Sequence, residues 1–187
     1  MSKIEIINRA LLKLGEPPVS SVNDTAFGKS YEMIYEDMKN LLLSSYPWRF
    51  AVDLRRVSRC DEKYGERYKY PLPSDCALLL GVFIEGGINL NYDLADNCIV
   101  CSYADGIDME YVKIIDDDTY FPFVFREALV AKIAAELAMR LKQNAGLKQL
   151  YDNEFYNFIR QAELNNEISK SVENLPDNSW IRIRQTW

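Results

Sequence analysis

Cysteines and aspartates are the residues of this sequence whose types and spacing could bind a metal ion. Cys98 and Cys101 are separated by two residues, which is the spacing of a zinc clip. The sequence has this one clip and no histidine that could complete a tetrahedral set. The pair also lies in a strand-like stretch, where side chains three positions apart point to opposite faces. We therefore expect no metal site and four reduced cysteines, namely Cys60, Cys76, Cys98 and Cys101.

Acidic side chains could also serve a hard cation or a hydrolytic reaction. The run Asp116-Asp117-Asp118 offers oxygen ligands, but adjacent carboxylates in a loop are usually only solvated. Glycoside hydrolysis needs two carboxylates at a fixed separation across a cleft, which a sequence alone does not show. The sequence has no glycine-rich phosphate loop, no nucleophile elbow, no HExxH motif and no histidine to act as a general base. We therefore expect no catalytic residues, no cofactor and no enzymatic activity.

The charge of the chain is concentrated in its middle third. The 187 residues carry a net charge of −6, and residues 51–120 hold 14 acidic against 7 basic side chains. Between Asp93 and Asp118, eight acidic residues face one basic residue, Lys113. Such a surface repels phosphate, so we expect no tight or specific binding of DNA. A solvated acidic face that aids solubility is the simplest interpretation.

The apolar content predicts a globular protein outside the membrane. Hydrophobic residues make up 48% of the chain, which is enough for one domain, with or without an inserted module. No apolar run approaches the roughly 20 residues that a membrane-spanning helix needs. The first residues show no basic region followed by an apolar stretch, so we expect no signal peptide and synthesis in the cytoplasm.

Apolar residues at helical spacing predict four helices. They run from about Ser2 to Leu14, from Asn23 or Asp24 to Ser45, from Pro122 to Gln143, and from Leu147 to Ser169. Ser2 with Glu5 forms a capping box, and Pro47 follows the end of the second helix. The expected core stripes are Ile4, Ile7, Leu11 and Leu14; Phe27, Tyr31, Ile34, Met38, Leu41 and Leu42; Phe125, Leu129, Ile133, Leu137 and Leu141; and Leu147, Leu150, Tyr151, Phe155, Phe158, Ile159 and Ala162.

The segment between the helix pairs is typical of strands. Alternating stretches cover residues 50–57, 77–84, 97–103 and 108–115, with turn signals at Gly86-Gly87 and Asp105-Gly106. The sequence therefore predicts a mainly α protein with a β insertion, in the α+β class. Its four-helix core is split two-and-two around a small antiparallel β module, and an extended C-terminal arm follows. The expected parts are residues 1–47 (first helix pair), 48–120 (β module), 121–170 (second helix pair) and 171–187 (arm).

The arm carries large side chains that its own folding cannot bury. They are Trp180, Arg182, Arg184 and Trp187. Tryptophan and arginine dominate the energetics of protein interfaces, and an extended segment suits strand addition or groove binding. The arm either packs back on its own subunit or docks onto another chain.

Four short strings resemble the head-to-tail adaptor (connector) family of tailed phages, typified by tail tubular protein A of short-tailed phages. The strings are Arg9-Ala10-Leu11-Leu12-Lys13-Leu14-Gly15, Tyr46-Pro47-Trp48-Arg49-Phe50-Ala51, Tyr70-Pro71-Leu72-Pro73-Ser74-Asp75-Cys76, and Ser179-Trp180 with Arg182 or Arg184. Each string is short, but their order, spacing and total length match together. We expect Trp48 to be buried where the helical core meets the β module.

The resemblance implies a structural protein of the virion. Such adaptors form a homo-oligomeric ring, commonly of twelve subunits, at the head-tail junction beneath the portal protein. The ring bears the tail or nozzle protein, and the genome passes through its lumen without specific binding. The arm, with Trp180, Arg182, Arg184 and Trp187, would contact the portal or a neighbouring subunit. The alternatives are a head-completion connector of a long-tailed particle, a carboxylate-based glycan-cleaving tail component and a cytosolic regulatory binding module.

Overall fold

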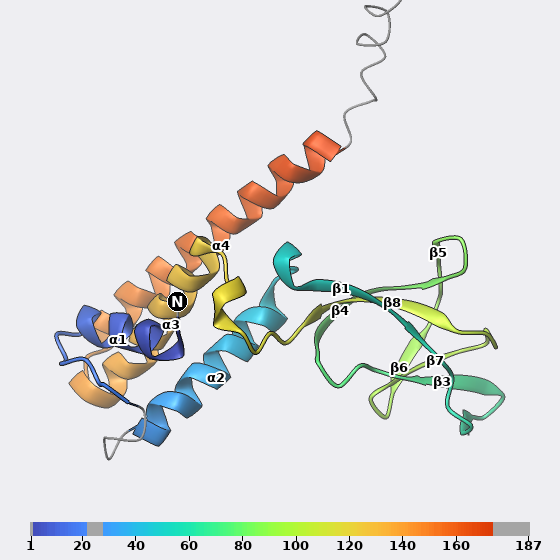
Figure 1. Cartoon of the computed structure of the whole chain (residues 1–187), viewed down its shortest axis with the longest axis horizontal. Helices are drawn as coiled ribbons and strands as arrows, with labels where there is room; N and C mark the ends of the chain where they lie inside the picture. The colour runs from blue at the N-terminus through green and yellow to red at the C-terminus, as the bar shows by residue number, and fades with distance from the viewer. Residues whose placement is uncertain (1, 22–27, 174–187) are drawn as a thin grey trace, which may run out of the picture.

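A body of helices and a module of β-strands lie at opposite ends of the molecule (Figure 1). The computed structural model describes residues 2–21 and 28–173. Within these ranges the chain forms four α-helices and two small antiparallel sheets, which confirms the α+β class. Every strand of the described part lies between Val52 and Lys113, and the helices lie on either side of that segment.

Local sequence signals set the first helix pair, α1 (Lys3–Lys13) and α2 (Gly28–Ser45). The capping box before α1 is formed: the Glu5 amide donates to the Ser2 hydroxyl, and the Ser2 amide donates to the Glu5 carboxylate at 2.7 Å. Gly15, with φ of +70°, takes the left-handed conformation that ends a helix. The predicted start of α2 at Asn23 or Asp24, and Phe27 of its stripe, lie outside the described residues.

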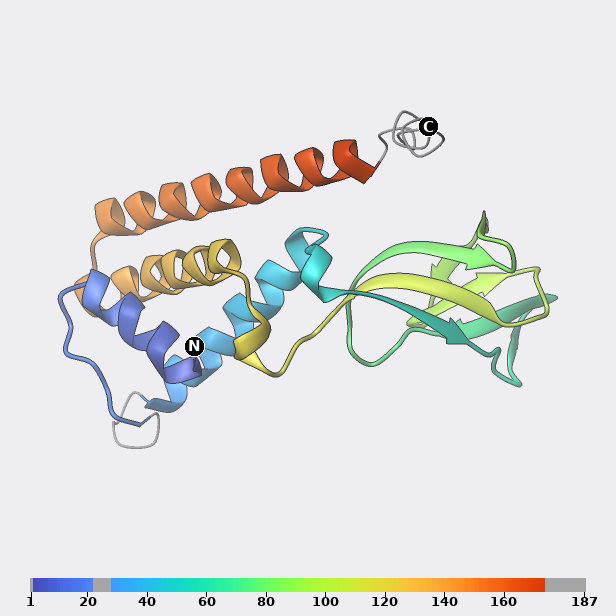
Figure 2. The ribbon, with the colours of Figure 1, turned by 45° about the horizontal axis from the view of Figure 1, so that its top comes forward.

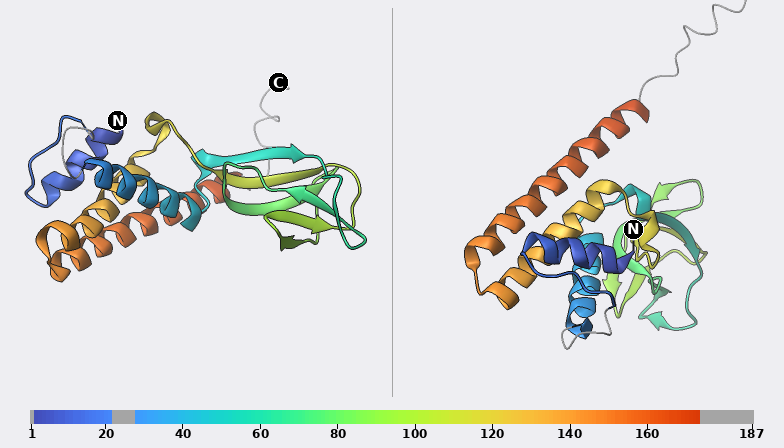
Figure 3. Two further views of the ribbon diagram at one scale, coloured as in Figure 1. Left: turned by 90° about the horizontal axis from the view of Figure 1, so that it is seen from below. Right: turned by 60° about the vertical axis from the view of Figure 1, so that its left-hand side comes forward.

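The second pair, α3 (Phe123–Lys142) and α4 (Ala145–Glu173), forms an antiparallel hairpin. Gln143 ends α3 with φ of +49°, one residue beyond the last helical turn. The helix α4 continues past the predicted end at Ser169, so residues 171–173 of the predicted arm are helical. No helix-breaking residue precedes Pro176, which explains the error. Because α4 is nine residues longer than α3, about 14 Å, its last turns project past the body (Figures 2 and 3).

The core of the body is built around the slim helix α3. Its alanines let the neighbouring helices approach closely, and they are all buried: Ala128, Ala131, Ala134, Ala135 and Ala138. An ion pair adds to the α1–α3 contact, where Arg9 Nη2 donates to Glu127 Oε2 at 2.8 Å. Most stripe residues pack as expected, but Leu41 and Leu150 are exposed. On α2 Leu42 is buried as predicted, and Leu43 is buried in place of Leu41, about 200° around the helix from it.

The β module contains more strands than the sequence predicts. One sheet has the order β1 (Val52–Val57), β8 (Ile107–Lys113), β4 (Cys76–Ile84) and β5 (Ile88–Asn89). The other has the order β2 (Lys63–Tyr64), β3 (Arg67–Pro71), β7 (Cys98–Cys101) and β6 (Asp93–Ala95). The four predicted strands correspond to β1, β4, β7 and β8. The sheets share a separate small core of Tyr70, Val82, Ile99, Cys101, Ile107, Met109 and Tyr111.

Trp48 lies where the helical body meets the β module. It is 5% exposed, its indole N–H donates to the Leu42 carbonyl at 2.7 Å, and its ring meets Phe125 edge-on at 4.9 Å. The 3₁₀ helix η1 (Arg49–Ala51) then leads into β1. Val112 of β8 belongs to the same buried cluster as Trp48, so the expectation that this tryptophan is buried at the junction is confirmed.

We predict that Trp48→Ala destabilises the protein by roughly 3–5 kcal/mol, because it leaves a cavity in a packed aromatic cluster. Tyr156→Ala on α4 is the matched control, since Tyr156 is 63% exposed. The free energy of unfolding should be measured by urea titration monitored by circular dichroism. Equal stability of the Trp48→Ala variant and the unmodified protein would show that this junction does not hold the fold together.

Candidate functional site

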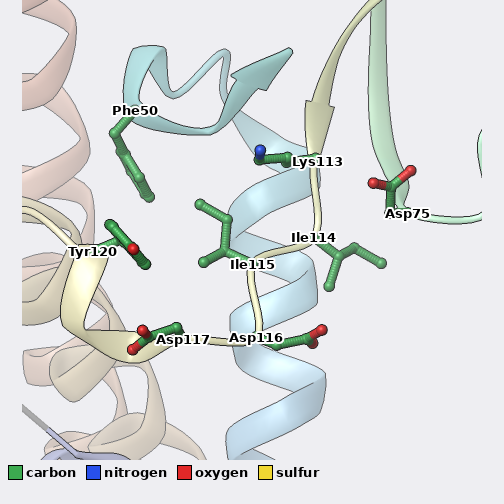
Figure 4. Close-up of a pocket in the computed structure, with 8 residues that line it drawn as sticks. All are labelled: Phe50, Asp75, Lys113, Ile114, Ile115, Asp116, Asp117 and Tyr120. Atoms are coloured by element: carbon green, nitrogen blue, oxygen red, sulfur yellow. The ribbon is translucent and has the colours of Figure 1, made fainter. Parts of the chain in front are cut away.

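A hollow of about 560 Å³ opens between the helical body and the β module (Figure 4). Apolar and acidic side chains line it together: Phe50, Asp75, Lys113, Ile114, Ile115, Asp116, Asp117 and Tyr120. These residues come from three separate segments of the chain. We take this hollow as the candidate functional site and call it the junction hollow.

Each wall of the junction hollow is fixed by a different element. Phe50 stands on η1 and packs edge-on against Phe125 at 5.1 Å, so the helical body holds its ring in place. The opposite wall is the link that follows β8, and the Ile114 amide in it donates to the Asp75 carbonyl at 2.7 Å. The short helix η2 (Asp118–Tyr120) closes the left side in Figure 4.

The helix η2 is bonded to α2 and capped by the residue that precedes it. The hydroxyl of Tyr35 on α2 donates a hydrogen bond to the Asp118 carboxylate. Asp117 caps η2, since its Oδ1 accepts from the Thr119 amide at 2.9 Å and from the Thr119 hydroxyl at 2.7 Å. These bonds favour the charged carboxylate and lower the pKa of Asp117. The wall that bears Tyr120 is therefore a fixed surface.

Asp75 is the carboxylate with the most partners in the junction hollow. Arg55 on β1 donates to both of its oxygens, at 3.2 and 3.0 Å, and the Tyr111 hydroxyl on β8 donates to Oδ1 at 3.2 Å. Burial raises the pKa of Asp75, but the hydrogen bonds from Arg55 outweigh it, and the pKa lies below its usual value. Burial, with the Asp75 charge beside it, raises the pKa of Tyr111 to about 12.

The remaining polar groups give the junction hollow an excess of negative charge. Three carboxylates and one ammonium line it, and Asp116 is exposed to solvent. Lys113 Nζ lies 3.8 Å from Asp53 Oδ2, outside the lining, so part of its charge is already balanced. Such a surface attracts a cationic group.

An aromatic surface lies beside this charge. Tyr120 is 70% exposed although it is a large aromatic side chain, and Phe50 faces the same space (Figure 4). Aromatic rings bind other rings and guanidinium groups through their faces. The junction hollow therefore suits a ligand that presents a positive charge next to an aromatic or aliphatic group.

The structure brings together two of the strings that sequence analysis singled out. Phe50 and Asp75 line the same hollow, and Pro47 and Trp48 lie directly before η1. Pro71 ends β3, where it pairs with Cys98 of β7, and Pro73 lies in the turn before β4. The other predicted site residues lie outside the described part: Trp180, Arg182, Arg184 and Trp187.

Sequence reasoning missed the partners of Asp75 and the role of Tyr120. Arg55 and Tyr111 reach Asp75 because β1, β8 and the start of β4 lie side by side, and no local signal encodes that order. The cysteines of the predicted strand are in β7, with Cys101 buried and Cys98 half-buried. In residues 2–21 and 28–173, no cluster of three or more cysteine and acidic side chains is arranged to hold a metal ion.

Comparisons with known proteins add no assignment. A scan against protein-family models finds no match, and a search of curated proteins finds no similar sequence. None of the described helices has the length and apolar character needed to cross a membrane.

We predict that Arg55→Met raises the pKa of Asp75, because it removes the two hydrogen bonds that favour the carboxylate. The matched control is Arg56→Met, since Arg56 pairs with Asp108 at 3.2 Å and not with Asp75. Carboxyl carbon chemical shifts followed from pH 2 to 7 would report the titration.

The pairing of Arg55 with Asp75 also sets how the free energy of unfolding depends on pH. The folded-state pKa of Asp75 is below the value of about 3.9 in unfolded chains, so its charge stabilises the fold above that pH. The stability that the charged Asp75 contributes is lost as the pH falls through its folded-state pKa. An Asp75 titration that is the same in Arg55→Met and in Arg56→Met would contradict the role given to Arg55.

Proposed function

We propose that this protein is a structural head-to-tail adaptor of a tailed phage. In this proposal it forms a ring beneath the portal protein, joins the portal to the tail and lets the genome pass through its lumen. One observation carries the proposal: two of the four strings that bear the family resemblance meet at one hollow through Phe50 and Asp75, which are 25 residues apart in the sequence. The strings thus belong to one spatial feature of the molecule.

The shape of the subunit supports a ring. The helical body and the β module present different faces at the two ends of an elongated molecule (Figure 2). Contacts between two different faces of identical subunits generate closed rings when the rotation between copies closes. Leu164 on α4 is exposed to solvent, and the last turns of this helix extend past its partner α3 (Figure 3). Such a helix end is suited to packing on another copy.

Charge pairing in the β module refines the prediction about DNA. Three carboxylates of the acidic segment pair with basic side chains: Asp93 with Arg67, Asp96 with Lys69 and Asp108 with Arg56. The module surface is therefore less uniformly negative than the residue count implies. In this proposal the genome passes without specific binding, because nearly balanced surface pairs do not attract phosphate strongly.

The carboxylates of the junction hollow favour the adaptor over a glycan-cleaving component. A general acid in glycoside hydrolysis needs a raised pKa so that it holds a proton near neutral pH. The pKa values of Asp75 and Asp117 are both lowered, by Arg55 and by Thr119 respectively. These pairings suit structural roles. A head-completion connector of a long-tailed particle would share the ring and differ in the protein it binds.

We predict that single-particle imaging of the purified full chain, alone and with the portal protein encoded in the same genome, shows rings. Ring formation follows from contacts between two different faces of each subunit. Discrete particles of one or two subunits under both conditions would contradict the adaptor proposal and favour an enzyme or a regulatory module.

We also predict that deletion of residues 174–187 leaves a soluble, helical protein that unfolds cooperatively and no longer binds the portal. The buried clusters of the described part lie within residues 6–162, so the deletion spares them. A thermal melt and a portal pull-down on the same sample test both halves of this prediction. Loss of cooperative unfolding would place the arm in the core, and unchanged portal binding would place the docking surface on the helical body.

A further inference from the structure

We propose that residues 174–187 of one copy dock into the junction hollow of a neighbouring copy. The junction hollow is then the receptor of a subunit-to-subunit interlock. This inference rests on the proposed ring and names the contact that closes it. On this inference, deletion of residues 174–187 abolishes portal binding because the ring no longer closes.

Charge complementarity selects this occupant. Residues 174–187 contain two arginines, Arg182 and Arg184, against one acidic residue, Asp177. The junction hollow presents three carboxylates and one ammonium. Arginine forms planar paired hydrogen bonds with carboxylates, which makes it the basic residue best suited to such a surface.

The carboxylates differ in their freedom to accept a new partner. Asp75 already accepts from Arg55 on both oxygens and from Tyr111. Asp117 uses Oδ1 to cap η2. Asp116 is exposed to solvent on the link between β8 and η2. We therefore assign it as the main contact for an incoming guanidinium group.

The apolar part of the junction hollow matches the rest of the segment. Trp180 and Arg182 are two residues apart, so in an extended chain their side chains lie on one face. In the hollow, Tyr120 lies on η2 and Asp116 on the link that leads into it, four residues earlier in the chain (Figure 4). A tryptophan placed on Tyr120 would cover an aromatic ring that is 70% exposed in the isolated subunit. Tryptophan and arginine together are the residue types that dominate binding at interfaces.

The position of the last helix sets where the segment starts. The helix α4 ends at Glu173 on the part that projects past the body (Figures 1 and 3). The fourteen residues that follow can span at most about 50 Å when fully extended. They start from the projecting end of α4, so in the proposed ring they extend toward a neighbouring copy. A contact from the segment of one copy to the hollow of the next joins two different surfaces, and this is the kind of contact that closes rings.

A photo-crosslinking experiment on the full chain tests the contact. Tyr120 is replaced by p-benzoylphenylalanine, and this variant is mixed with isotopically labelled chain of the unmodified sequence. After irradiation, mass spectrometry identifies the linked peptides and shows whether they come from one copy or from two. We expect links from position 120 to residues 174–187 of another copy. The control places the same residue at Tyr64, an exposed tyrosine of β2, and should not give this link.

A charge reversal at Asp116, made in the chain that carries p-benzoylphenylalanine at position 120, tests the contact assigned to Asp116. Asp116→Lys should weaken the apparent affinity, read from the concentration dependence of the link, about tenfold. Asp105→Lys is the matched control, since Asp105 is an exposed aspartate that precedes the start of β8, at the opposite end of that strand from Asp116. An equal effect of the two reversals would overturn the assignment of Asp116.

The remaining outcomes separate the interlock from the adaptor function. Links within one copy, links from position 120 to other segments, or no link at all would overturn the interlock. Rings seen by imaging without the link between copies would overturn the interlock and leave the adaptor function standing. The link between copies without rings would overturn the adaptor function and leave the contact standing.

Discussion

The packing of Trp48 against Phe125 is the contact on which the arrangement of the two halves depends. Trp48 packs at the end of the helical body, and its indole N–H donates a hydrogen bond to the Leu42 carbonyl near the end of α2. Because Pro47 precedes it and η1 follows it, the chain leaves the body in one direction and enters β1. The returning strand β8 brings Val112 into the same cluster, so both connections between the halves are anchored at one place.

The junction hollow is a consequence of this anchoring. Its aromatic wall belongs to the helical body through Phe50, and its acidic wall belongs to the β module and the link after β8. Each wall is held by bonds that do not involve a ligand, such as Tyr35 to Asp118 and Arg55 to Asp75. A preformed surface of this kind costs little to order on binding, which is what a repeated assembly contact requires.

The sequence predicted the helices better than the strands, and the errors have physical reasons. The capping box at Ser2 and the stop at Pro47 are local signals, and both ends form where they were expected. Helical spacing places Leu41 and Leu150 in the predicted core stripes because they are apolar. Their exposure depends on which neighbouring helix covers that side, and helical spacing does not carry this information. The strands β2, β3, β5 and β6 span two to five residues each, too few to show a clear alternation.

The sequence by itself determined the class of the fold, the ends of the described helices to within a few residues, and the burial of Trp48. These features follow from interactions between residues close in the chain, or from the cost of exposing a large aromatic side chain. Only the tertiary structure decided that Arg55 and Tyr111 hold Asp75, and that Phe50 and Asp75 share one hollow. The reason is the strand order β1-β8-β4, which places side by side segments that are far apart in sequence. That order is set by strand pairing and core packing within the whole module, and no local pattern encodes it.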